Sequence, residues 1–296
     1  MDPYWNQQNP EPFHRRPMLL ALFLTLAAGC QSVQEVNRTR HPDTLVHLNT
    51  WSAFSEGDYA PHWTVDQVQL MGDHGLGTFE GLDGEMIIYS GRVYRAALDG
   101  SISEMAPTSG IPYAAVTWLN GDRYYDIEDM SKTLFLRGIE LRRGTDQYPI
   151  AIEGNLLFDW IVTRSVPAQA QPYPDLTTAL AGQQVQTNTL IAGALIGFYM
   201  PAYMDRFHPP GFHFHFLSAD HQRGGHVLDF HVRQGRVTLD PSPELYLLVP
   251  TNQPAFRFQP MDGPKAKPPK PRPLAPALQR ERCSRLAFPS GDRHRH

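Results

Sequence analysis

Six of the 13 histidines in the chain fall between positions 208 and 231. Within this stretch, residues 212–216 alternate phenylalanine and histidine without a break. Because successive side chains of a strand face opposite sides, His213 and His215 share one face and the phenylalanines share the other. Gly224-Gly225 gives turn flexibility, and if residue 216 lies opposite residue 225, His226 lies opposite His215. The spacing therefore predicts a β-hairpin on which three imidazoles converge.

An isolated His-x-His pair on an antiparallel strand is usually just its solvent-facing side. A third histidine at the position predicted by the hairpin favours the protein ligands of a catalytic zinc site, with positions left open for water or substrate. Similar sets hold Fe, Mn or Co, so the ligands do not identify the metal. A metal site built on cysteine is excluded because the chain has only 2 cysteines. The other histidines of the stretch are predicted to lie in loops or on the opposite face and not to be ligands: His208, His221 and His231.

The elements that must position this hairpin are mostly strands. Short β-branched or aromatic runs bounded by Gly, Asp and Pro predict strands over 85–89, 92–97, 113–119 and 150–164, the first two joined by Ser90-Gly91. Two helices are predicted, over 65–71 after Thr64 as N-cap and over 175–184. We therefore expect a mostly β domain of the α+β class.

Composition limits the function. The 41% hydrophobic and 19% charged residues are typical of a globular protein. A pI near 6.3 argues against a nucleic-acid partner. The net charge of −4 combines −10 over residues 1–259 (17 basic, 27 acidic) with +6 over 260–296 (9 basic, 3 acidic). The latter segment has eight prolines, which predicts an extended, disordered tail.

The N-terminal segment has the pattern of an export signal. Residues 18–28 are apolar, and these eleven residues are too few to span a bilayer, which takes about 20. Small residues then precede Cys30, as in a bacterial lipoprotein signal whose cysteine is lipidated. We expect a signal over 1–30, a linker over 31–46, and a protein that is either lipid-anchored in the bacterial cell envelope or secreted. Without a functional signal it would be cytoplasmic.

Several long motifs occur together in the body of the chain. They are MGDHGLGTFEGLDGEMIIYSGRVYRAALDG (71–100), IPYAAVTW (111–118), IEGNLLFDWIVTRSVPAQAQPYPDL (152–176), GALIGFYMPAYM (193–204) and PGFHFHFLSADHQRGGHVLDFHV (210–232). On these motifs, the chain resembles the alpha-acetolactate decarboxylase family over about 47–258. The resemblance implies one domain over 47–259, with mixed or antiparallel sheets in two similar subdomains and a barrel-like half that carries the histidine hairpin.

The resemblance also implies an activity: a carboxy-lyase that converts 2-acetolactate to acetoin and CO₂ with a divalent metal, usually zinc, and no organic cofactor. His213, His215 and His226 match the metal ligands of the family. Its other site residues match Glu85 (in LDGE, beside the metal), Arg164 (in TRSVP, holding the substrate) and Thr78 (in GLGTF, lining the site). The partner implied by the resemblance is the small-molecule substrate. A homodimer is left open.

The implied chemistry is consistent with these residue types. Acetolactate is a β-keto acid, so the electron pair released with CO₂ flows into the ketone and gives an enediolate. A metal would stabilise that charge as a Lewis acid. An arginine suits the carboxylate through its two-pronged guanidinium. Protonation of the enediolate needs a positioned acid, a role assigned here to Glu85.

The chain departs from the family after Phe258, where the family has a closing segment with a second glutamate. Glu281, in ALQRERCSR, does not align with that acid. One alternative is therefore an envelope-anchored binding protein for a metal or small ligand, on the same fold but with lost or weak catalysis. Another is a cupin-like oxygenase. Cupins place a glutamate soon after His-x-His, whereas Asp220 is the candidate acid here.

Overall fold

The computed structural model describes residues 43–251 except 122 and 146. A first sheet contains β1 (Thr44–Leu48), β3 (His74–Thr78), β4 (Glu85–Tyr89), β5 (Arg92–Ala96), β6 (Ile102–Glu104), β8 (Tyr113–Thr117) and β14 (Glu244–Leu248). Its strands lie in the order β14-β1-β8-β3-β4-β5-β6. Neighbours pair antiparallel except β1 and β14, which run parallel, so the sheet is mixed.

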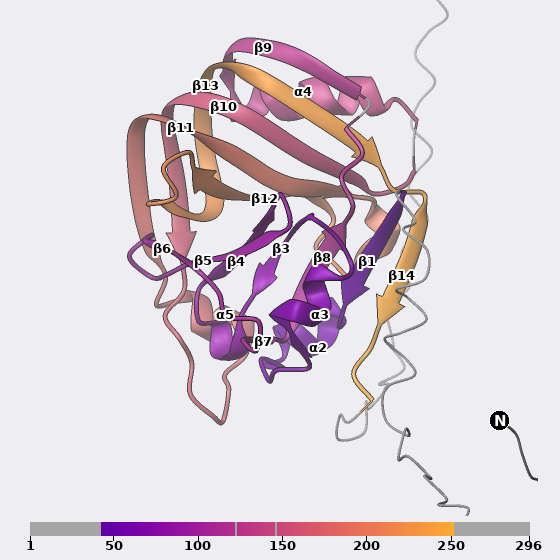
Figure 1. Cartoon of the computed structure of the whole chain (residues 1–296), viewed down its shortest axis with the longest axis vertical. Helices are drawn as coiled ribbons and strands as arrows, with labels where there is room; N and C mark the ends of the chain where they lie inside the picture. The colour runs from indigo at the N-terminus through magenta and orange to yellow at the C-terminus, as the bar shows by residue number, and fades with distance from the viewer. Residues whose placement is uncertain (1–42, 122, 146, 252–296) are drawn as a thin grey trace, which may run out of the picture. The chain divides into compact units, whose positions relative to one another are not determined.

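The second sheet is antiparallel and has longer strands. They are β9 (Arg123–Ser131), β10 (Ile150–Ser165), β11 (Gln184–Met200), β12 (Gly211–Ser218) and β13 (Gly224–Pro241). Their order is β10-β11-β12-β13-β9, and β10 also pairs with β13. This additional pairing closes β10, β11, β12 and β13 into a ring, visible in the upper part of Figure 1. The ring supports the expected barrel-like half.

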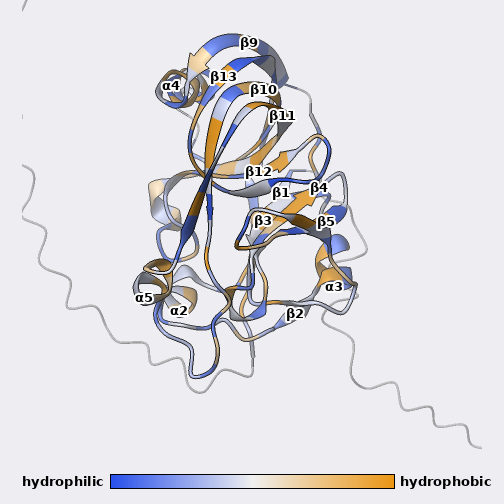
Figure 2. Ribbon diagram, turned by 90° about the vertical axis from the view of Figure 1, so that its left-hand side faces the viewer, coloured by the Kyte–Doolittle hydropathy of each residue, from blue (hydrophilic) through white to orange (hydrophobic). Residues whose placement is uncertain are grey.

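Aromatic side chains form the core of the ring. Phe216 of the histidine strand meets Phe158 edge to face at 5.4 Å, and Phe158 meets Phe230 at 5.8 Å. Phe214 and Phe216 are buried, and Phe212 packs against the same cluster. Hydrophobic and hydrophilic residues alternate along these strands (Figure 2). The alternation predicted for residues 212–216 is therefore confirmed: the phenylalanine face is the core face.

The opposite face of the ring packs against the first sheet. Ile87 and Tyr94 of the first sheet form one buried cluster with Ile196 of β11 and Leu217 of β12. A second cluster joins the two sheets through the side chains of Leu45, Leu76, Ala115, Ala151, Phe198, Met200 and Met204. Because β12 buries its phenylalanines inside the ring, its histidines are turned towards β4 and the first sheet.

The helices are short. They are α2 (Trp51–Ser55), α3 (Val65–Gln69), η1 (Glu80–Leu82), α4 (Lys132–Arg143), α5 (Leu176–Leu180) and η2 (Ala202–Met204), beside a small sheet of β2 (Trp63–Thr64) and β7 (Gly110–Ile111). Thr64 is the N-cap of α3 as expected, and its N–H donates to Gln67 Oε1 at 3.0 Å. The helix predicted over 175–184 ends at Leu180 with Ala181 as its C-cap, and β11 begins at Gln184.

The predicted strands are confirmed closely. The hairpin over 85–97 appears as β4 and β5, and the strand over 150–164 is one residue shorter than β10. The strand predicted over 113–119 ends at Thr117. The mostly β, α+β class is likewise confirmed.

Several predictions fall outside the described residues. These concern the signal over 1–30 with Cys30, most of the linker over 31–46, and the tail over 260–296 with Glu281. Within residues 43–251, no helix has the length and apolar character needed to cross a membrane.

Candidate metal centre and active site

The histidine hairpin has the predicted register. His215 lies opposite His226, and Phe216 lies opposite Gly225. The tight connection is made by residues 219–223, where Ser218 Oγ accepts from the N–H of Arg223 at 2.9 Å. Gly224 and Gly225 therefore lie within β13 and not in the turn itself.

Gly225 permits a close approach between β13 and β10. Its φ is +147°, and a Cβ atom at this position would lie 3.0 Å from the carbonyl oxygen of Arg164. Only glycine accepts both the backbone angle and the short distance without strain. The next pair in the register is His226 with Arg164. The pairing of β13 with β10 that closes the ring therefore places Arg164, which is predicted to bind the substrate, beside His226, a predicted metal ligand.

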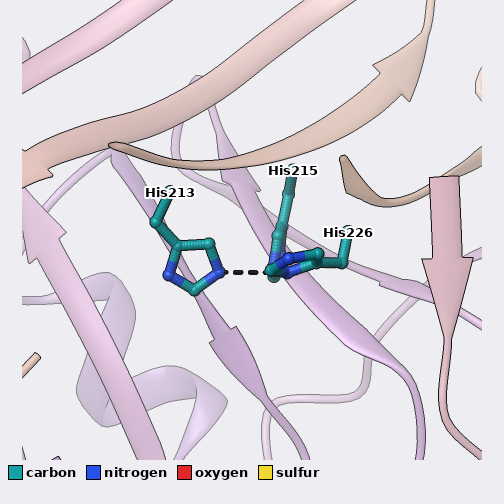
Figure 3. A group of neighbouring side chains, drawn as sticks. All are labelled: His213, His215 and His226. Atoms are coloured by element: carbon teal, nitrogen blue, oxygen red, sulfur yellow. Dashed lines mark hydrogen bonds between the residues drawn. The ribbon is translucent and has the colours of Figure 1, made fainter. Parts of the chain in front are cut away.

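The three predicted ligands converge (Figure 3). His213 and His215 come from β12 and His226 from β13, and one ligand nitrogen of each lies within 4.8 Å of the others. His213 Nε2 is 3.1 Å from His226 Nδ1. Two nitrogens bound to one tetrahedral zinc ion at about 2.1 Å would be roughly 3.4 Å apart. The spacing of these imidazoles therefore fits a shared metal ion.

The contacts of His215 give a second test of the fit. Its Nδ1 lies 2.7 Å from the carbonyl oxygen of Met86, so this nitrogen must carry the proton and donate. Its Nε2 is buried and makes no hydrogen bond within the described part of the protein, although the carboxylate of Glu85 lies 3.4 Å away. A buried polar atom without a partner is costly unless something binds it. The lone pair of Nε2 is therefore available to a metal.

Burial also sets the protonation state of the cluster. It lowers the pKa of His215 to about 4, and it lowers the pKa values of His213 and His226 well below the ordinary value. The neighbouring imidazoles and Arg164 add to the shift, because they disfavour further positive charge. The three side chains are therefore neutral at pH 7, which is the form that binds metals.

The structure brings the other predicted site residues to the same place. Glu85 is the first residue of β4, and its Oε2 lies 3.4 Å from His215 Nε2. Its Oε1 lies 3.6 Å from Nη1 of Arg164. Thr78 is paired with Glu85 across β3 and β4, and its hydroxyl donates to the carbonyl oxygen of Gly84 at 2.8 Å. Strand β4 thus supplies the acid through Glu85 and orients a ligand through the neighbouring Met86.

The electrostatic setting of Glu85 is unusual for a glutamate. Burial raises its pKa to about 7, although the positive charge of Arg164 acts in the opposite direction. A carboxyl group with such a pKa is partly protonated at neutral pH, so it can both give and take a proton. The site therefore combines three neutral imidazoles, a guanidinium and a carboxyl poised for proton transfer.

Sequence spacing missed two further histidines next to the cluster. His208 lies in a loop as expected and is not among the three converging ligands, but it is fully buried, and its Nε2 is 3.0 Å from His213 Nδ1. His47 of β1 is also fully buried, and its Nε2 is 3.1 Å from His208 Nδ1. No spacing rule links positions this distant in the chain.

The remaining histidines of the rich stretch lie elsewhere, as expected. The ring of His221 packs edge to face against the ring of Tyr94. His231 Nδ1 is 3.2 Å from Asp159 and its Nε2 is 3.6 Å from Asp129, at a partly exposed position. Neither belongs to the group of histidines that converge on one point.

Comparison with known proteins gives a consistent set of relatives. Residues 45–263 match the family model described as alpha-acetolactate decarboxylase. The alpha-acetolactate decarboxylase of Klebsiella aerogenes is 32% identical over 231 residues, covering 76% of this chain and 87% of that protein. Its counterpart from Methanosarcina mazei is 31% identical over 213 residues, covering 71% and 73%. The crystal structure of alpha-acetolactate decarboxylase from Bacillus subtilis strain 168 has a TM-score of 0.69 and 27% identity, covering 70% and 89%.

Proposed function

Since the chain belongs to the alpha-acetolactate decarboxylase family, a family of carboxy-lyases, we propose that it converts 2-acetolactate to acetoin and CO₂ with a divalent metal held by His213, His215 and His226. The observation that carries the proposal is the convergence of these neutral imidazoles with Glu85 and Arg164. Zinc is our choice of metal, because three histidines with open positions suit it.

The reaction needs a place for one electron pair. When the bond between the carboxylate carbon and C2 breaks, CO₂ leaves and the pair moves into the adjacent ketone, which gives an enediolate. A bound divalent metal supplies Lewis-acid stabilisation of the negative charge that develops on oxygen. Stabilising charge at this stage is usually the largest contribution to catalysis.

Arg164 and Glu85 have complementary roles in this proposal. The guanidinium of Arg164 binds the substrate carboxylate and orients the bond that breaks. The carboxyl group of Glu85 delivers a proton to the carbon that lost CO₂, which yields acetoin, and then regains a proton from water. Its raised pKa supports this role, because the acid form is present at neutral pH.

The test is to measure acetoin formed from racemic acetolactate by the zinc-loaded chain. We expect product well above the rate seen with zinc alone. No product above that rate would contradict the proposal. Zinc bound at one ion per chain, lost in the His213→Ala/His215→Ala variant but without acetoin, would instead select a binding protein on the same fold.

A further inference from the structure

A row of buried imidazoles leads from the first sheet to the candidate metal centre. His47 of β1, His208 in the loop before β12 and His213 of β12 follow one another with nitrogen–nitrogen distances of 3.1 Å and 3.0 Å. His47 and His208 are fully buried, and His213 is partly buried. Neither of the first two belongs to the three converging ligands. His208 is buried against the ligand His213, and His47 is buried behind it against His208; this arrangement requires an explanation.

The direction of the hydrogen bonds is set at the far end of the row. His47 Nδ1 lies 3.1 Å from the backbone carbonyl oxygen of Asn49. A carbonyl oxygen can only accept, so His47 Nδ1 must carry the proton. Burial keeps His47 neutral, and a neutral imidazole has one proton. Its Nε2 is therefore an acceptor.

The same reasoning applies next to His208 and then to His213. His208 Nδ1 faces the acceptor Nε2 of His47, so it must donate, and His208 Nε2 becomes an acceptor. His213 Nδ1 faces that acceptor and must donate in turn. The proton of His213 is then on Nδ1, and the lone pair of its Nε2 points to His226. One backbone carbonyl thus determines the tautomer of a residue on another sheet.

Tyr113 is compatible with this order of donors. Its hydroxyl donates to the carbonyl oxygen of Phe207 at 2.9 Å, and the hydroxyl oxygen lies 3.1 Å from His208 Nδ1. This oxygen is thus a second acceptor for the same proton of His208. The ring of Tyr113 packs against both His47 and His208, and the substitution Tyr113→Phe keeps that ring.

We propose that His47 and His208 are positioning residues, which hold His213 in the tautomer that offers Nε2 to the metal. The inference rests on the proposed function, since it concerns the metal of that site. His215 achieves the same state in a single step, because its Nδ1 donates directly to the carbonyl of Met86. Partners of this kind orient metal-bound histidines, and their loss typically lowers metal affinity about 10- to 100-fold.

The test compares three variants of the 296-residue chain. His208→Phe retains an aromatic ring but removes the acceptor for His213. His208→Gln restores one acceptor and one donor on a flexible side chain. Tyr113→Phe removes the neighbouring hydroxyl and leaves the row intact. Zinc affinity is measured by competition with a chelator, and the tautomer of His213 is read in the zinc-free chain from long-range ¹H–¹⁵N NMR correlations. Circular dichroism shows which variants are folded.

We expect His208→Phe to weaken zinc binding about 10- to 100-fold and to lose the Nδ1–H tautomer of His213. His208→Gln should recover much of both, and Tyr113→Phe should change neither. A folded His208→Phe variant with unchanged affinity and tautomer would overturn the inference. If His208→Phe is unfolded, an Nε2–H tautomer of His213 in the unaltered chain would overturn it. Absence of zinc binding by the unaltered chain would contradict the proposed function, whereas the tautomer spectra would still decide the positioning role.

Discussion

At the scale of single residues, the site depends on Glu85 being buried beside a cation and an imidazole. Its carboxylate oxygens lie 3.6 Å from Arg164 and 3.4 Å from His215. Burial opposes the charged form and Arg164 favours it, and the net result is a pKa near 7. A carboxyl group in this state can exchange a proton with a reacting carbon at neutral pH.

Replacement of this acid should separate catalysis from metal binding. We expect Glu85→Gln to lower kcat roughly 100-fold or more, since it removes the proposed proton donor. Zinc content should stay near one ion per chain, because the three histidines remain. Acetoin formation and bound zinc are measured together. Glu104→Gln is the matched control, as Glu104 pairs with Arg92 in an exposed ion pair. Equal activities of the two variants would rule out the assigned role.

Arg164 is the residue that we propose to bind the substrate carboxylate. Arg164→Lys keeps the positive charge but loses the two-pronged donor geometry. We expect kcat/KM to fall about 10- to 100-fold, because a hydrogen bond to a charged group contributes about 1.5–3 kcal/mol. The comparison is Arg233→Lys, where the half-exposed arginine pairs with Asp159. Steady-state kinetics with acetolactate that left kcat/KM unchanged in Arg164→Lys would argue against this function.

At the scale of elements, the position of His213 depends on close contact between β11 and β12. Gly197 of β11 lies where an added Cβ would stand 2.1 Å from the carbonyl oxygen of His213 and 2.5 Å from the ring of Phe214. Both strands are held by neighbours on their other edges, so neither can move away freely. Any side chain at this position therefore displaces β12, the strand that carries His213.

We expect Gly197→Ala to reduce the free energy of unfolding by roughly 2 kcal/mol or more and to weaken zinc binding, as overpacking in a fixed sheet does. Gly138→Ala is the matched control. This glycine lies inside α4, where the added methyl group would stand 3.4 Å from the flexible end of Arg142. There alanine should be neutral or stabilise by up to about 1 kcal/mol. Urea unfolding measures the free energy of unfolding, and chelator competition measures zinc affinity. If both were unchanged in Gly197→Ala, this account would be contradicted.

At the scale of the whole molecule, buried histidines make stability depend on pH. Burial lowers the pKa of His47 from 6.5 to about 4. Below pH 6.5, His47 becomes protonated in the unfolded chain but stays neutral in the folded chain. Acid therefore favours unfolding. The stability linked to this group is fully present above pH 6.5. It is lost as the pH falls to about 4, and the loss is about 3 kcal/mol. His208, His213 and His226 shift in the same direction.

Glu85 acts in the opposite direction. Its pKa is raised from 4.5 to about 7, so the folded form takes up a proton first and gains stability as the pH falls through this range. The histidines outnumber it, and we therefore expect the zinc-free chain to lose stability between pH 6.5 and 4.5. Urea unfolding at several pH values with a chelator present measures the loss. The decline should be steeper in Glu85→Gln, and a flat profile in both proteins would refute the linkage.

Much of the fold could be predicted from residue patterns because the signals were local. The alternation of phenylalanine and histidine over 212–216 predicted which face of β12 is buried, since strand geometry leaves no other arrangement. Turn glycines marked the hairpin of β4 and β5. The closed ring was beyond such patterns, because the pairing of β10 with β13 joins distant segments and depends on packing of the whole sheet.

The candidate site, like the fold, was predicted from the sequence only in part. The sequence by itself determined the three converging histidines, because they lie on one hairpin whose register follows from its spacing. Glu85 and Arg164 were identified from their motifs, but only the tertiary structure decided that they meet beside His215. It alone decided that His47 stands at the start of a row ending at His213. The physical reason is that hairpin contacts are dictated by local strand geometry, whereas contacts between sheets depend on how two separate faces pack.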